Sequence, residues 1–270
     1  MRAVGIVAAA GSGLHLGADL PKALVPLAGR PLVCWAVDTL RAGGVDEVVV
    51  AVPAAEHAEF AAVLPGGVRL VDGGATRTAS VRAALGAVSV SAGAVLVHDA
   101  ARPLTPPAVV ARVLDALAAG ALAVVPVLPV VDTTVVVGDD GTIAAVPDRA
   151  ALRRVQTPQG FSRVVLAEAY DDLPIGEELT DDAAVVRALG VPVGTVDGDE
   201  RAAKITVAQD LALAELIART TGERASQGDA GSRQGVSIAA SASERGAERP
   251  RRRQVSSQRG TSGVRSGVSP

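Results

Sequence analysis

The chain has 270 residues, of which 49% are apolar, 20% charged and 1% aromatic, so it can bury a sizeable core in one domain or two. So few aromatic side chains argue against a partner held by base stacking, as single-stranded nucleic acids are. The one cysteine, Cys34, excludes an internal disulfide framework, and no apolar run reaches the roughly 20 residues that cross a bilayer. The apolar stretch after Arg2 is short for a signal peptide and runs into a glycine loop. We therefore expect a cytoplasmic protein without a membrane partner.

Charge divides the chain near residue 221. Residues 222–270 carry 9 arginines against 4 acids, a net charge of +5, whereas residues 1–221 carry 17 basic and 25 acidic side chains, a net charge of −8. The tail consists of Ser, Gly, Arg, Gln and Ala without apolar periodicity, so we expect residues 222–270 to be disordered. Its basic run at 249–253 offers a contact for nucleic acid or a membrane. A solvated tail is favoured, because acids are interspersed and apolar anchors are absent.

Residues 1–221 alternate short Val/Ile/Ala runs with amphipathic stretches at helical period. This pattern predicts βα units in a parallel sheet that is covered on both faces, an α/β fold. The expected strands are 4–8, 47–52, 68–71, 94–98, 121–127 and 193–197, and the expected helices are 31–42, 54–64, 77–87, 106–119, 162–171, 180–189 and 207–220. Residues 133–137 and 143–146, joined by a Gly-Asp-Asp-Gly turn, predict a β-hairpin inserted into this pattern.

A glycine loop, residues 9–17, follows the first predicted strand, where open α/β sheets bind ligands. Its glycines run G-x-G-x-x-x-G, one residue longer than the dinucleotide form, and Asp38, the acid about 20 residues on, falls inside a helix. No G-K-[ST] follows, so a P-loop is excluded. Lys22 comes next, placing an ammonium beside a loop whose N–H groups can wrap a triphosphate. A plain turn beside a surface lysine is the alternative.

Lysine usage adds weight to that residue. Of the 26 basic side chains only Lys22 and Lys204 are lysine, and the other 24 are arginine. A bias of this kind follows base composition, so the two remaining lysines are candidates for positions where a compact ammonium cannot be exchanged for a planar guanidinium. Chance survival of two lysines is the alternative explanation.

Further polar motifs follow predicted strands or open helices. Residues 73–81 place two glycines before a hydroxyl-rich helix start, which is typical of a capped N-terminus. Residues 97–103 lead from a strand directly to Asp99 and Arg102, and charges beyond a strand's carboxyl end favour a functional site over a plain salt bridge. The remaining motifs are Pro129–Thr133, Arg149, Gln156–Phe161, Thr180–Asp182, Gly198–Asp199 and Lys204–Thr206.

Taken together and in this order, the motifs resemble those of the 2-C-methyl-D-erythritol 4-phosphate cytidylyltransferase family. The resemblance covers residues 3 to about 217 and rests on A-A-G-x-G with P-K downstream, H-D-A-A-R-P, D-T, Q-T-P-Q-x-F, T-D-D and K-I-T. It implies a Rossmann-like, mostly parallel nucleotidyltransferase sheet and transfer of CMP from CTP to methylerythritol phosphate in non-mevalonate isoprenoid synthesis. It also implies Mg²⁺ as cofactor and a homodimer in which the hairpin, about 132–150, reaches over the twofold partner.

The resemblance also implies roles for single residues. It places Lys22 on the triphosphate and makes Lys204 a second catalytic lysine on the substrate side. It places Asp99 and Arg102 on the substrate and ribose side. It makes Thr133 and Arg149 arm residues that bind the sugar phosphate in the neighbouring subunit's site. The positions implied around the cytidine are Ala9, Ala10, Gly11, Gly13, Gly74 and Ser80.

Two positions depart from the family pattern. His15 stands where the family has a catalytic arginine, and Ala203 stands where it has asparagine before the second lysine. A phosphomonoester nucleophile is already an anion, so the reaction needs cations at the phosphates rather than a general base. Lys22, Lys204 and a protonated His15 would supply them. A cytidylyltransferase for another polyol phosphate, such as ribitol 5-phosphate, and a catalytically impaired nucleotide-binding paralogue are the alternatives.

Overall fold

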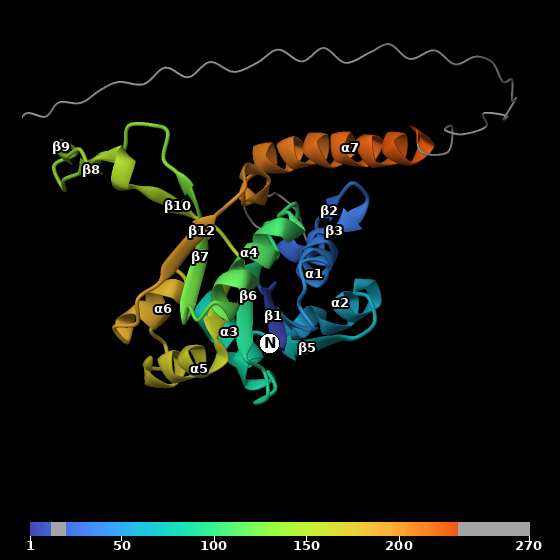
Figure 1. The fold of residues 1–270 in the computed structure, drawn as a ribbon, viewed down its shortest axis with the longest axis horizontal. Helices are drawn as coiled ribbons and strands as arrows, with labels where there is room; N and C mark the ends of the chain where they lie inside the picture. Colours follow the sequence, from blue (N-terminus) through green and yellow to red (C-terminus); the bar gives the residue numbers. More distant parts are fainter. Residues whose placement is uncertain (12–19, 232–270) are drawn as a thin grey trace, which may run out of the picture. The chain divides into compact units, whose positions relative to one another are not determined.

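The structure, a computed structural model, describes residues 1–11 and 20–231. Its centre is an eight-stranded sheet (Figure 1). Strands β1, β4, β5 and β6 pair in parallel, and β7 pairs in parallel with β12. Strand β11 lies antiparallel between β6 and β7. The strands are β1 (Ala3–Ala8), β4 (Glu47–Val52), β5 (Val68–Asp72), β6 (Ala94–Asp99), β7 (Ala123–Pro129), β10 (Arg153–Val155), β11 (Gln159–Ser162) and β12 (Gly194–Asp197).

Strand β7 is paired along both of its edges. Val127 pairs with Val155 of β10 and also with Asp197 of β12, so β10 and β12 lie on opposite sides of β7. Strands β10 and β11 share the edge that faces β6, one after the other. The order in which β4 and β6 flank β1 makes β1 the point at which the chain turns from one half of the sheet to the other, where open α/β sheets bind ligands.

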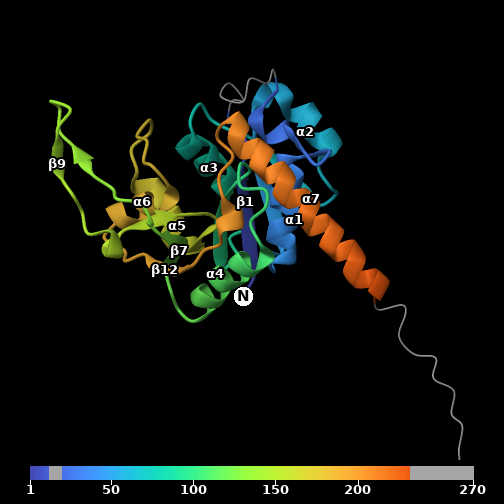
Figure 2. The same ribbon diagram turned by 90° about the horizontal axis from the view of Figure 1, so that it is seen from above.

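Helices cover both faces of the sheet (Figure 2). Side chains alternate across each strand, so Ala3 and Val7 of β1 join one core cluster while Val4 and Ile6 join the other. The first cluster includes side chains of α1 (Leu32–Ala42), α2 (His57–Val63) and α4 (Pro107–Ala118). The second includes side chains of α3 (Arg77–Gly86), α5 (Arg163–Asp172) and α6 (Asp182–Ala188).

A third, smaller cluster anchors the last helix, α7 (Ala208–Gly231), beside the segment that carries Lys22. Ala214 and Ala218 of α7 pack with Leu27 and Leu32. Leu27 belongs to a short ribbon, β2 (Pro26–Leu27) with β3 (Arg30–Pro31), that follows the 3₁₀ turn η2 (Lys22–Leu24). This packing places α7 beside the segment that follows Lys22. Lys22 and the segment before α7 therefore lie on the same side of the sheet.

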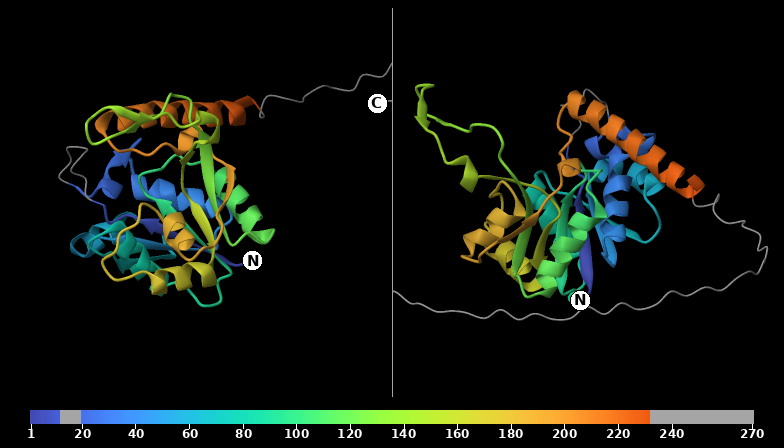
Figure 3. Two further views of the ribbon diagram at one scale, coloured as in Figure 1. Left: turned by 90° about the vertical axis from the view of Figure 1, so that its left-hand side faces the viewer. Right: turned by 45° about the horizontal axis from the view of Figure 1, so that its top comes forward.

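The strands and helices expected from periodicity are confirmed to within two residues, except for helix 54–64, the hairpin and the end of the last helix. The expected helix 54–64 is divided into η3 (Ala54–Glu56) and α2, and the expected hairpin is shorter, β8 (Val136–Val137) with β9 (Ile143–Ala145). This hairpin extends away from the sheet (Figure 3). Strands β10 and β11 were not expected, because their polar residues and the nearby Pro158 are typical of a loop.

The end of α7 is a correction. The sequence predicted a helix that ends at 220 and disorder over 222–270, whereas α7 continues to Gly231; residues 232–270 lie outside the described residues. The stretch 223–227, Glu-Arg-Ala-Ser-Gln, contains good helix formers that extend an existing helix without a new nucleation step. Met1–Gly228 forms one compact unit. None of the described helices is both long and apolar enough to cross a membrane.

Candidate active site

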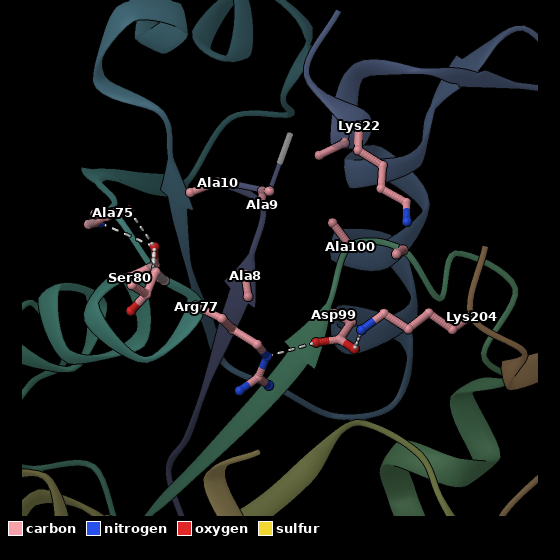
Figure 4. A pocket seen from close by; sticks show the side chains of 15 residues that line it. Ala8, Ala9, Ala10, Lys22, Ala75, Arg77, Ser80, Asp99, Ala100 and Lys204 are labelled. Atoms are coloured by element: carbon pink, nitrogen blue, oxygen red, sulfur yellow. Dashed lines mark hydrogen bonds and ion pairs between the residues drawn. The ribbon is translucent and has the colours of Figure 1, made fainter. Parts of the chain in front are cut away.

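A cavity of about 470 Å³ opens beyond the carboxyl ends of β1 and β6. Three chain segments form most of the wall that the described residues provide, and Ala23 also contributes to it. Lys22 and Lys204 line the cavity as well (Figure 4). The segments are 8–11 after β1, 74–77 with Ser80 at the start of α3, and 99–101 after β6. Each follows a strand of the parallel sheet, because parallel strands bring their carboxyl ends to one edge.

The start of α3 forms a tight wall of this cavity. Thr76 caps the helix, accepting a hydrogen bond from Ala79 N–H at 3.1 Å. The buried Ser80 hydroxyl accepts from Gly74 N–H (3.1 Å) and donates to the Thr76 carbonyl (2.8 Å). A Cβ on Gly74 would lie 2.4 Å from Ala79 Cβ, so this position requires glycine for close packing. Ser80 therefore shapes the loop as well as lining the cavity.

The two lysines of the chain, Lys22 and Lys204, both line the cavity. Burial, followed by the positive charge of Lys204, lowers the pKa of Lys22. Lys204 Nζ lies 3.1 Å from Asp99 Oδ2. Ile205, next to Lys204, is buried and donates its N–H to the Ala101 carbonyl at 2.8 Å, which fixes the Lys204 segment beside β6. Two cations thus converge from opposite ends of the sequence.

Asp99 is the anionic centre of this cluster. Its Oδ1 lies 3.2 Å from Arg77 Nε, and its Oδ2 lies 3.6 Å from Arg102 Nε in addition to the Lys204 contact. Burial alone would raise the pKa of Asp99, but the charges of Arg77, Lys204 and Arg102 hold it well below its usual range. Asp99 is therefore ionised at neutral pH, and it offsets part of the repulsion between the cations.

Arg77 is a site residue that sequence reasoning missed. Its guanidinium bridges two carboxylates, because Nη2 donates to Asp182 Oδ2 at 2.7 Å while Nε contacts Asp99. Asp182 is fully buried at the start of α6 and accepts the Tyr170 hydroxyl at 2.6 Å. These two carboxylates raise the pKa of Arg77 despite its burial. A cation in the first turn of a helix opposes the helix dipole, and that was the available sequence signal.

The Q-T-P-Q segment lies behind the cavity and connects three loops. The Gln156 side chain exchanges hydrogen bonds with Asp199, donating at 2.9 Å and accepting at 3.0 Å. Gln159 donates to Asp181 (2.8 Å) and accepts from Ala183 N–H (3.0 Å). Both glutamines are buried. They hold the loop before Lys204 and the loop that carries Asp182, which explains why amides rather than apolar groups occupy these positions.

Thr157, between the two glutamines, contacts the Asp99 backbone. Its Oγ1 accepts the Asp99 N–H at 3.1 Å and lies 2.8 Å from Nδ1 of the fully buried His98. Burial lowers the pKa of His98 to about 4. A neutral His98 can accept a hydrogen bond from the Thr157 hydroxyl at Nδ1. This hydroxyl then donates one hydrogen bond, to His98, and accepts one, from Asp99 N–H.

The structure brings most of the expected nucleotide and catalytic positions together. Ala9, Ala10, Gly11, Gly74, Ser80, Lys22, Asp99 and Lys204 all line the cavity. Arg102 does not line it: its Nη1 donates to the Ala202 carbonyl at 2.7 Å, so it supports the wall from behind. His15 and Gly13 lie outside the described residues.

The two arm residues are separate from the cavity of their own chain. Thr133 and Arg149 are exposed and are not among its lining residues. Arg149 lies in the 3₁₀ turn η4 (Arg149–Ala151), where Nη1 donates to the Val131 carbonyl at 3.1 Å. A role in binding at this cavity would need the arm of another copy.

The described residues that line the cavity do not provide enough ligands to hold a metal ion by themselves. Across residues 1–11 and 20–231, no three His, Cys, Asp or Glu side chains cluster in a way that could hold an ion. The carboxylate that the described lining offers, Asp99, is already paired with three cations. Mg²⁺ prefers several oxygen ligands and often takes them from substrate phosphates.

Comparison with known proteins places this arrangement in a family. The family model described as 2-C-methyl-D-erythritol 4-phosphate cytidylyltransferase matches residues 3–220. Proteins with that name from Nocardia farcinica and Saccharopolyspora erythraea are 53% and 51% identical to this chain, over 79% and 80% of it and over 93% and 99% of their own lengths.

A solved structure agrees with the sequence relatives. The crystal structure of 2-C-methyl-D-erythritol 4-phosphate cytidylyltransferase from Thermus thermophilus is 42% identical, with a TM-score of 0.68, and covers 81% of this chain and 100% of that one. The family model, the sequence relatives and the fold all cover the body that forms the cavity. This chain belongs to the 2-C-methyl-D-erythritol 4-phosphate cytidylyltransferase family.

Proposed function

We propose that the cavity beyond β1 and β6 is the site at which this enzyme transfers CMP from CTP to 2-C-methyl-D-erythritol 4-phosphate. The products are CDP-methylerythritol and pyrophosphate, and the reaction serves isoprenoid biosynthesis. The observation that carries the proposal is the convergence of Lys22 and Lys204 on one cavity, in a member of this family. A cytoplasmic location is part of the proposal, since CTP is an intracellular nucleotide.

The chemistry fits the charges of the cavity. A phosphate oxygen of the sugar phosphate forms the new bond to the α-phosphorus of CTP, and the bond between that phosphorus and the α–β bridging oxygen breaks. Pyrophosphate leaves with the electron pair, and no proton has to move. Negative charge spreads over the reacting phosphoryl group, so fixed cations stabilise the transition state. Lys22 and Lys204 supply them, and Asp99 holds Lys204 in place.

Nucleotide binding belongs to the glycine-rich walls. The backbone of Ala9, Ala10 and Gly11 and the loop at Gly74 present groups to the cavity without bulky side chains. Main-chain N–H groups in such loops bind phosphate or base oxygens. We place CTP here, with its triphosphate toward Lys22, because that lysine closes the far side of the cavity.

Magnesium is proposed to enter with the nucleotide. The described residues provide no protein-held site for it, whereas a triphosphate offers several oxygens. A bound ion of this kind neutralises phosphate charge. The residues of this chain then act on the metal–nucleotide complex by binding and orienting it.

A homodimer is proposed to complete the site. Thr133 and Arg149 carry groups suited to a sugar phosphate, yet they lie away from their own cavity. The arm also exposes apolar side chains, with Val136, Val137 and Ile143 at least half exposed, and exposed apolar patches mark contact surfaces. We propose that this arm crosses to a second copy and contributes Thr133 and Arg149 to its cavity.

The test is pyrophosphate release with CTP and either methylerythritol phosphate or ribitol 5-phosphate, measured side by side. We expect turnover with methylerythritol phosphate and a much lower kcat/KM with ribitol phosphate. The reverse preference would identify a different polyol phosphate as substrate. CTP binding without release of pyrophosphate at saturating substrate would instead identify a nucleotide-binding protein that has lost catalysis.

A further inference from the structure

Asp99 receives its cations on two different oxygens. Arg77 contacts Oδ1, whereas Lys204 contacts Oδ2 (Figure 4). Arg102 also contacts Oδ2. The Lys204 side chain is 45% exposed, and among the described residues its ion-pair partner is Asp99. The direction in which the Asp99 carboxylate faces therefore sets the position of that ammonium.

Arg77 is itself held rigidly from the opposite side. Asp182 accepts its Nη2, Asp182 is 0% exposed, and the Tyr170 hydroxyl donates to the other oxygen of Asp182. Gln159 fixes the backbone at this point by accepting the Ala183 N–H. The planar guanidinium of Arg77 binds Asp182 and Asp99 through different nitrogens, so a fixed Asp182 also fixes the orientation of Asp99. A lysine ammonium has no such planar fork.

We propose that Arg77 is a positioning residue for the transfer reaction, which holds the Asp99 carboxylate so that Lys204 is fixed at the reacting phosphates. The chain of contacts runs from Tyr170 through Asp182, Arg77 and Asp99 to Lys204. This inference rests on the proposed cytidylyl transfer. Without Arg77 the Asp99 carboxylate is free to turn toward Arg102, and the Lys204 ammonium loses its fixed place.

The main variant is Arg77→Lys, which keeps a positive charge beside Asp182 but loses the fork. A misplacement of about 1 Å in a positioned group can lower the rate about 10²-fold, so we expect kcat to fall by about 10- to 100-fold. The KM for CTP should stay within about threefold, because the Gly74 loop keeps its own hydrogen bonds. The control is Arg69→Lys on β5, where Arg69 donates to the Ala87 carbonyl and touches no member of this chain of contacts. Its kcat should match the wild type.

A double-mutant cycle with Lys204→Met separates this role from others. If Arg77 acts through Lys204, adding Arg77→Lys to Lys204→Met should lower kcat by less than about threefold. An equal loss in both backgrounds would overturn the proposal, since Arg77 would then act on the substrate directly. Wild-type kcat in Arg77→Lys would also overturn it.

Asp182→Asn supplies a second variant in case Arg77→Lys does not fold, because Asp182 is not among the lining residues of the cavity. It releases the far end of Arg77 and should give the same kcat loss with little change in KM. Wild-type kcat in a folded Asp182→Asn would contradict the proposal. Absence of turnover in the wild type would contradict the proposed function instead, so the two failures are distinguishable.

Discussion

Asp99 Oδ2 and Lys204 Nζ lie 3.1 Å apart and join the end of β6 to the segment before α7. The first of these residues ends a strand of the parallel sheet, and the second follows the turn η5 (Glu200–Ala202). Their contact places a cation at the cavity that Lys22 also lines. This pairing is the basis of the predictions on the lysines.

Lys22→Ala and Lys204→Ala should each lower turnover by about 10²–10³-fold, because each removes a preorganised charge that is used mainly in the transition state. Neither side chain belongs to a core cluster, so the unfolding transition should be nearly unchanged. Steady-state pyrophosphate release and circular dichroism check the two parts. Arg69→Ala, which removes a surface cation bonded to the Ala87 carbonyl, is the control and should keep wild-type turnover. Wild-type turnover in either lysine variant would contradict the role assigned to it.

Lys22 should react readily with an amine-selective reagent. Burial and the nearby charge of Lys204 lower the pKa of Lys22, so at a given alkaline pH more of it is the neutral, nucleophilic amine. Removing the neighbouring charge in Lys204→Ala should slow labelling of Lys22, whereas Lys204→Arg keeps a charge and should not. Peptide mapping by mass spectrometry over time measures the rate. Equal Lys22 labelling in all three proteins would show that the charge of Lys204 does not reach Lys22.

Two inactive variants should complement each other in mixed dimers. Arg149 lies outside the cavity of its own chain, so a dimer of one Lys22→Ala and one Arg149→Ala chain would contain one site with both residues intact. Random mixing of equal amounts should restore roughly a quarter of wild-type activity, since half of the dimers are mixed and each has one intact site. Mixing Lys22→Ala with the double variant Lys22→Ala, Arg149→Ala is the control without recovery. No recovery in the first mixture despite proven subunit exchange would contradict the shared site.

Two glycines of the α3 region should respond oppositely to alanine. A Cβ at Gly74 would lie 2.4 Å from Ala79 Cβ, whereas a Cβ at Gly86 meets nothing within 4 Å. Gly74→Ala should lower the free energy of unfolding by about 1–3 kcal/mol through overpacking and raise the KM for CTP. Gly86→Ala should raise it by about 0.4–1 kcal/mol and leave KM unchanged. Urea denaturation and steady-state kinetics provide the comparison, and an unchanged KM in Gly74→Ala would argue against nucleotide binding at this wall.

His98 should make the folded protein less stable as the pH falls. Burial lowers the pKa of His98 to about 4, from an ordinary value near 6.5. Between these two values the unfolded chain binds a proton that the folded chain does not, so acid favours unfolding. The free energy of unfolding should therefore drop by about 2 kcal/mol between pH 7 and pH 5.

Urea denaturation at several pH values measures the slope of the free energy of unfolding against pH. His98→Asn should flatten it, because the variant has no titrating group at that position. His57→Asn is the matched control at the protein surface and should keep the wild-type slope. A wild-type slope in His98→Asn would show that another group is responsible.

Periodicity predicted the elements best where burial is regular. Strand β4 begins and ends where the Val-rich run 47–52 does, since both of its faces are buried under helices. Strand β11 was missed because Gln159 is buried among polar partners rather than apolar ones. A buried amide whose hydrogen bonds come from distant loops has the sequence appearance of a surface residue.

For the site, motif order identified the loops but not all of their contacts. Lys22, Lys204 and Asp99 could be named in advance because they stand out by residue type or by following a strand. Arg77 could not, since its partners Asp99 and Asp182 lie on other elements. The same limitation applies to Arg102, because its hydrogen bond to the Ala202 carbonyl joins segments that are far apart in the sequence.

The amino-acid sequence by itself determined the succession of strands and helices along the chain, the glycine loop after β1 and the family. Hydrophobic period and motif spacing are local properties, so they can be recognised without the tertiary structure. The tertiary structure alone decided which charges meet. An ion pair depends on distances of a few ångströms between segments, and those distances follow from the order of strands in the sheet. Thus the pairing of β6 with β1 places Asp99 beside Ala8, and the packing of α7 on Leu27 brings Lys204 within reach of Asp99.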